Sequence, residues 1–114
     1  MPHFILDMNE RLLTLHPPEH LMRIVHDTAD ASGLFAKGDI KVRIRPYAYG
    51  TVGNAAADFL HVFAYIMEGR TTEQKSALSN AVVRKLKELY PDAPVISMNV
   101  MEFERATYAN RTLV

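Results

Sequence analysis

The sequence contains no cysteine. Disulfides, thiolate nucleophiles and cysteine-based zinc sites are therefore excluded together, and a reducing compartment is compatible with the chain. Charge of one sign is also lacking, since thirteen lysines and arginines balance thirteen aspartates and glutamates. Nothing global attracts nucleic acid or an anionic membrane. We expect neither as a partner.

Long hydrophobic runs are absent as well. A membrane-spanning helix needs about 20 apolar residues in succession, and no stretch approaches that length. Asp7, Glu10 and Arg11 interrupt the apolar start before the core of a signal peptide can form. We therefore expect a cytoplasmic protein.

The 114 residues are enough for one domain. We expect it to span 1–114, with two halves at approximately 1–47 and 58–103 and a polar tail at 104–114. The order of predicted elements in the first half is repeated in the second.

The first half predicts a strand, a helix and a second strand. The apolar run at 3–8 is typical of a buried strand, and 9–16 predict a loop. A helix is predicted over 17–33, where Gly33 suits its end. The stretch 39–47 alternates between apolar and basic side chains, which predicts a strand with a wet face.

The second half follows a small, glycine-containing segment at 48–58 that predicts a turn or a mobile loop. Thr71 and Gln74 form a capping-box pattern at the start of an amphipathic helix. The predicted elements are a buried strand at 59–67, that helix at 71–90 and a strand at 95–103. Two β-α-β units thus predict an α+β fold, one four-stranded sheet with both helices on one face.

The second face of such a sheet has no cover within the chain. Its strands carry too much apolar side chain to face water, because strand 59–67 is apolar throughout. We therefore expect an oligomer whose core is built from several sheets.

The sequence lacks the motifs of most familiar binding and catalytic sites. The five glycines fit neither a phosphate-binding loop nor a dinucleotide fingerprint. His16 and His20 are separated by two prolines, and His61 lies in an apolar strand, where a hydrogen-bonded core histidine is the favoured interpretation. No metal site is predicted. The serines lack an adjacent histidine–acid pair for nucleophilic catalysis.

Pro2 leaves two interpretations open. It is either a stiff start to a strand or, once Met1 is removed, an N-terminal secondary amine. An α-amino group has a reference pKa near 8, and burial or nearby cations lower it toward that of a neutral base. General base catalysis at neutral pH needs such a group.

Two cationic features remain. Lys41, Arg43 and Arg45 share one face of a predicted strand, where charges on an exposed edge are the favoured interpretation. Arg70 stands between a strand and a helix start, a junction that attracts carboxylates. A solvated loop arginine is an equally good interpretation of Arg70.

Taken together, the motifs "PHFI" at the start, "GLF" at 33–35, "DIKVR" at 39–43 and "FLHVFAYIMEGRTTEQK" at 59–75 resemble the 5-carboxymethyl-2-hydroxymuconate isomerase family of the tautomerase superfamily. The resemblance covers roughly 2–90. It implies a cofactor-independent isomerase, a homotrimer, acting on a small anionic dienol carboxylate in aromatic compound catabolism.

The resemblance also implies residue roles. Pro2 matches the family's general base. Arg70 matches the arginine of the family's "GR" motif after the third strand. The family's second strand has the pattern G-I-R-x-R, whereas this chain has Lys41 at the first arginine and keeps Arg43 at the second. Lysine binds a carboxylate without arginine's bidentate fork, which puts the identity of the substrate in question.

Two further functions stay open. A tautomerase-superfamily enzyme with a different substrate fits the same residues, as does a non-catalytic trimeric binding protein that has kept the fold.

Overall fold

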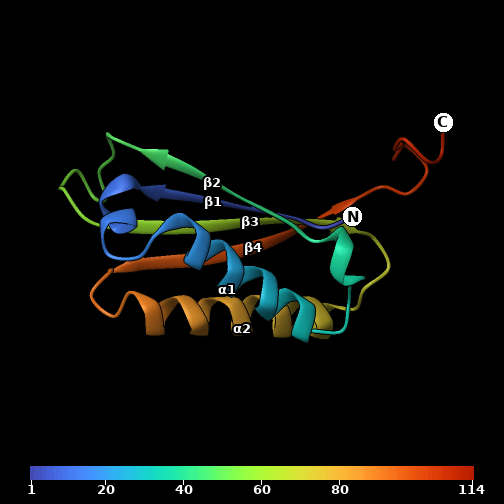
Figure 1. Ribbon diagram of the computed structural model, residues 1–114, viewed down its shortest axis with the longest axis horizontal. Helices are drawn as coiled ribbons and strands as arrows, with labels where there is room; N and C mark the ends of the chain where they lie inside the picture. Colours follow the sequence, from blue (N-terminus) through green and yellow to red (C-terminus); the bar gives the residue numbers. More distant parts are fainter.

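Two β-α-β units build one sheet in the computed structural model, which describes residues 1–114 (Figure 1). Along the chain the elements are β1 (His3–Asn9), the 3₁₀ helix η1 (Glu10–Thr14), α1 (Pro18–Ala31), the 3₁₀ helix η2 (Lys37–Asp39), β2 (Lys41–Tyr47), β3 (Phe59–Met67), α2 (Thr72–Leu89) and β4 (Val95–Phe103). Neither helix is long and apolar enough to cross a membrane.

The strand order is β2-β1-β3-β4. Within each unit the strands are parallel, β1 with β2 and β3 with β4, and the two units meet through the antiparallel pair β1 and β3. Both helices cover the same face of the sheet (Figure 1). The predicted α+β fold is therefore confirmed, including the repeat.

The core lies between the sheet and the helices. Alternate side chains of β1 and β3 point into it, and one stripe of each helix closes it from the other side. The fully buried members are Phe4, Leu6, Met8, Leu60, Val62, Ala64 and Ile66 from the strands and Leu21, Val25, Ala29, Leu78, Val82 and Leu86 from the helices.

The opposite face of the sheet has no layer over it (Figure 1). Phe63 and Tyr65 of β3 are only half-buried there, and the exposed Met101 of β4 lies on the same face. His61 also belongs to this face, so the interpretation as a core histidine is wrong. Strand alternation turns it away from the helices, although it is hydrogen-bonded, to Ser97 at 2.6 Å and to Asn99 at 2.7 Å.

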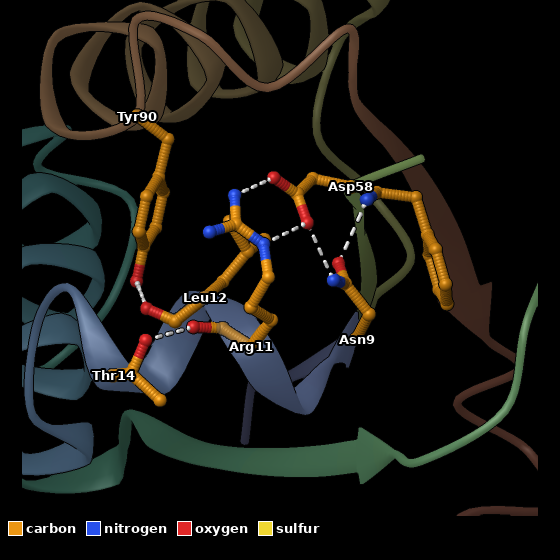
Figure 2. A network of polar contacts seen from close by, with 7 residues as sticks. Asn9, Arg11, Leu12, Thr14, Asp58 and Tyr90 are labelled. Carbon is orange, nitrogen blue, oxygen red and sulfur yellow. Dashed lines mark hydrogen bonds and ion pairs between the residues drawn. The ribbon is translucent and has the colours of Figure 1, made fainter. Parts of the chain in front are cut away.

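The segment predicted as a loop at 9–16 is largely ordered. Asn9 belongs to β1, and the next five residues form η1. Figure 2 shows why this corner is fixed: Asp58, just before β3, accepts hydrogen bonds from the side chains of Asn9 and Arg11. The Tyr90 hydroxyl donates to the Leu12 carbonyl at 3.1 Å. These partners lie 47 to 78 residues apart in sequence, beyond the reach of a local pattern.

The start of α2 follows its prediction closely. The Thr71 hydroxyl accepts from the Gln74 backbone N–H at 3.1 Å, and the Gln74 side chain accepts from the Thr71 N–H at 2.8 Å. Both halves of the capping box are therefore formed. The capped start of α2 directly follows Arg70, which therefore lies at the edge of the sheet where β3 ends.

Candidate active site

Pro2 is buried at the start of β1, at the end of the molecule where the N-terminus lies (Figure 1). Its carbonyl accepts a hydrogen bond from the Lys41 backbone N–H at 3.0 Å, which ties it to the first residue of β2. With Met1 in place the Pro2 nitrogen is an amide nitrogen. The Met1 amine in turn donates to the Asp39 carbonyl at 3.2 Å.

A pocket of about 400 Å³ opens beside Pro2. Pockets that bind small ligands begin at roughly 300 Å³, so its size suits a small organic acid. Five segments supply its walls: the N-terminus, the turn after α1, the end of η2, the junction between β3 and α2, and the C-terminal tail. The residues are Met1, Pro2, Leu34, Phe35, Ala36, Asp39, Met67, Arg70, Arg105, Tyr108, Asn110 and Leu113.

Arg70 reaches the pocket through a sharp turn. Gly69 has a φ of 114°, in the left-handed region that favours glycine. The Arg70 guanidinium donates to the Leu34 carbonyl at 2.5 Å and to the Met67 carbonyl at 3.4 Å, and it lies 5.4 Å from the centre of the Phe35 ring. The alternative of a solvated loop arginine is therefore wrong.

These contacts fix the guanidinium without neutralising it. No carboxylate forms an ion pair with Arg70. A guanidinium has five N–H donors, and the two carbonyls occupy two of them. Three N–H groups and a full positive charge remain for a ligand.

Lys41 and Arg43 do not line this pocket. The Lys41 ammonium donates to the Asp39 carbonyl at 2.7 Å, close to the N-terminus. The Arg43 guanidinium lies against the His3 imidazole at 3.0 Å, on the uncovered face of the sheet. The structure thus brings Pro2 and Arg70 together within one chain, with Lys41 at their margin and Arg43 further along β2.

The surroundings of the N-terminus favour a neutral amine. Burial lowers the pKa of the Met1 amine below its ordinary value of 8.0, and the nearby Lys41 and Arg70 lower it further, whereas Asp39 opposes them. The pKa of His3 is lowered too, first by burial and then by Arg43 and Lys41. Positive potential is therefore concentrated at this end of a chain that has no net charge.

The other pockets and side-chain clusters are weaker candidates for an active site. A groove of about 690 Å³ lies between α1 and α2, and its charged lining residues are Asp27 of α1 and Arg84, Lys85 and Glu88 of α2. Neither Pro2 nor Arg70 lines it. Nowhere do three histidine, aspartate or glutamate side chains lie close enough together to hold a metal ion.

Sequence reasoning missed four polar members of the pocket: Asp39, Arg105, Tyr108 and Asn110. The sequence marks Asp39 only because it stands where the family pattern G-I-R-x-R has glycine. Arg105 and Tyr108 lie in the polar tail, where neither periodicity nor spacing marks them. The "GLF" motif at 33–35 did carry a signal, since Leu34 and Phe35 hold Arg70.

Solved structures place this fold among known proteins. A 5-carboxymethyl-2-hydroxymuconate isomerase from Deinococcus radiodurans R1 is 21% identical with a TM-score of 0.83, covering 96% of this chain and 88% of that one. A fused 4-OT, described as a wild-type symmetric trimer, is 14% identical with a TM-score of 0.81, covering 98% and 94%. N1, a member of the cis-3-chloroacrylic acid dehalogenase family, is 14% identical with a TM-score of 0.75, covering 96% and 80%.

These likenesses define the class of the fold, the small α+β fold of the tautomerase superfamily. The family model for 5-carboxymethyl-2-hydroxymuconate isomerase matches residues 2–112. The chain belongs to that family, which supports an isomerase or tautomerase. No functionally curated protein sequence matches the chain.

Proposed function

We propose that the protein is a cofactor-independent isomerase that moves a proton on an anionic dienol carboxylate such as 5-carboxymethyl-2-hydroxymuconate. Its base is the neutral secondary amine of Pro2, exposed by removal of Met1. The observation that carries the proposal is that Pro2 and the uncompensated Arg70 guanidinium line one pocket.

The proton transfer needs only groups of this chain. The Pro2 nitrogen takes the proton of the enol hydroxyl and returns it to a carbon of the diene, so that the C–OH group becomes C=O and a double bond shifts. Positioned general bases contribute about 10²–10⁴-fold to such steps. Arg70 binds a carboxylate and stabilises the enolate charge while the proton is on the amine.

Lys41 and Arg43 are proposed as secondary substrate-binding residues. Lys41 lies beside the N-terminus, close enough to lower the pKa of the Met1 amine. Arg43 lies on the uncovered sheet face, so it reaches a substrate only where a neighbouring subunit approaches that face. We propose a homotrimer that covers this face, in line with its half-buried aromatic side chains and with the trimeric fused 4-OT of the same fold.

Lysine at position 41 supports a second candidate, the same proton transfer on a different carboxylate substrate. Lysine is a point charge with no bidentate geometry, and its ammonium is turned to the Asp39 carbonyl. A panel of dienol and keto-acid substrates, ranked by kcat/KM, decides between the two.

The decisive experiment compares two forms of the chain, one with Pro2 at the N-terminus and one that retains Met1, each verified by intact mass. Both forms should fold and assemble alike by sedimentation. Only the first should turn over substrate, because an amide nitrogen has no basic lone pair. Its kcat/KM should rise with pH along one limb whose pKa lies below about 8.

Pro2→Ala is the matched control, since removal of Met1 then leaves a primary amine at the same place. We expect reduced activity with a displaced pH limb. Equal turnover by the Met1-retaining form would show that Pro2 is not the base.

A further inference from the structure

We propose that Arg105, on the C-terminal tail, binds a second carboxylate of the substrate in the Pro2 pocket that Arg70 also lines. This inference rests on the proposed function for the identity of the substrate, and it makes the tail a part of the binding site.

The tail is anchored where it leaves the sheet. The Arg105 backbone N–H donates to the Glu68 side chain at 2.5 Å, and the Glu68 N–H donates to the Phe103 carbonyl at 3.1 Å. The Tyr108 ring packs 5.5 Å from the Phe103 ring, which in turn stacks with Tyr65 at 6.0 Å. The root of the tail is thus attached to the ends of β3 and β4.

Four residues of the tail, Arg105, Tyr108, Asn110 and Leu113, line the pocket that contains Pro2 and Arg70. The Arg105 side chain makes no ion pair and no hydrogen bond within the chain. By contrast, Arg11 and Arg45 are both paired with carboxylates. Arg105 therefore brings an unpaired guanidinium to the pocket.

The charge balance of the pocket calls for such a ligand. Its cations are Arg70 and Arg105 and its only carboxylate is Asp39, which lies 3.9 Å from the N-terminal amine. Lys41, the residue expected on the second strand, does not line the pocket, and its ammonium donates to the Asp39 carbonyl. Arg70 is held by backbone carbonyls and Arg105 is unpaired, yet both line one pocket. Their two guanidinium groups match two carboxylates on one substrate, because each offers bidentate hydrogen bonds to one.

The test measures binding separately from turnover. The probes are hexanedioate and hexanoate, which have the same chain length but two carboxylates or one, titrated by calorimetry into the form with Pro2 at the N-terminus. The variant is Arg105→Gln, whose backbone bond to Glu68 is unaffected. The matched control is Arg111→Gln, an exposed arginine of the same tail that does not line the pocket.

Wild type should prefer hexanedioate, and Arg105→Gln should weaken its binding by about 10- to 100-fold, the range for a lost charged hydrogen bond. Hexanoate binding should change less than about twofold, and Arg111→Gln should leave both probes unchanged. Equal weakening of both probes, no weakening, or no preference by wild type would overturn the assignment.

The same variants separate this inference from the proposed function. If hexanedioate binding depends on Arg105 while no dienol is turned over, the subsite stands and the isomerase proposal fails. If dienol turnover depends on Pro2 while Arg105→Gln binds both probes as wild type does, the isomerase stands and the subsite is wrong.

Discussion

Replacing Arg70 tests two roles at once, because its guanidinium is bound to the chain and open to a ligand. Arg70→Ala removes the donors to the Leu34 and Met67 carbonyls. Each net hydrogen bond is worth about 0.5–1.5 kcal/mol, so the free energy of unfolding should fall by about 1–3 kcal/mol. The sequence alone predicts almost no loss of stability, since it leaves a solvated arginine as an option.

The effect on catalysis is expected to be of a different kind. A charged hydrogen bond to the substrate is worth about 1.5–3 kcal/mol, which corresponds to about 10- to 150-fold in kcat/KM. Arg70→Lys keeps the charge and loses the fork, so its kcat/KM should fall between those of Arg70→Ala and wild type. Arg84→Ala, an exposed arginine on α2 remote from Pro2, is the control and should change neither quantity.

The assay pairs urea unfolding with steady-state kinetics on a dienol carboxylate. The kinetics are measured without urea, at a temperature where every variant is fully folded. Loss of stability with unchanged kcat/KM would make Arg70 a purely structural residue and refute its role toward the carboxylate. Loss of activity with unchanged stability would refute the weight given to its two carbonyl contacts.

Two predictions concern the corner shown in Figure 2. Burial raises the pKa of Tyr90 to about 12, so the free energy of unfolding should fall as pH rises from about 10 toward that value. Tyr90→Phe should reduce this fall in urea titrations at alkaline pH. At neutral pH Tyr90→Phe should cost about 0.5–1.5 kcal/mol for the bond to Leu12, and an unchanged pH profile would contradict the burial. The Arg11 hydrogen bond lowers the pKa of Asp58 below 3.8, so its stabilisation is present above that pH and is lost as pH falls below it. The stability difference between wild type and Asp58→Asn should therefore shrink from pH 6 to pH 3, and a constant difference would show that the carboxylate charge is irrelevant.

Local patterns predicted the architecture well, for a physical reason. Alternation predicted β2, a continuous apolar run predicted β3, and the Thr71–Gln74 box predicted the start of α2, because each of these signals arises between neighbours in sequence. His61 was assigned to the wrong face because its apolar neighbours concealed the period of two.

The sequence predicted a site residue only where neighbours along the chain mark its position. Arg70 was visible because it stands at a strand-to-helix junction, whereas its partner Leu34 is 36 residues away. Arg105 had no local signal, since its place in the pocket depends on Glu68, 37 residues earlier. Likewise the order within 10–14 depends on Asp58 and Tyr90, which approach it only in the folded chain.

The internal repeat has a consequence for stoichiometry. The start of β1 and the start of β3 are equivalent positions in the two units, so Pro2 corresponds to Asp58. In the proposed enzyme, removal of Met1 exposes an amine at the first position, but the second lies within a continuous polypeptide, where no free amine exists. Asp58 instead joins Asn9 and Arg11 in a structural contact. Doubling the unit within one chain therefore leaves a single reactive terminus for every two units, and an amine-directed label that enters the pocket should be incorporated at one equivalent per chain.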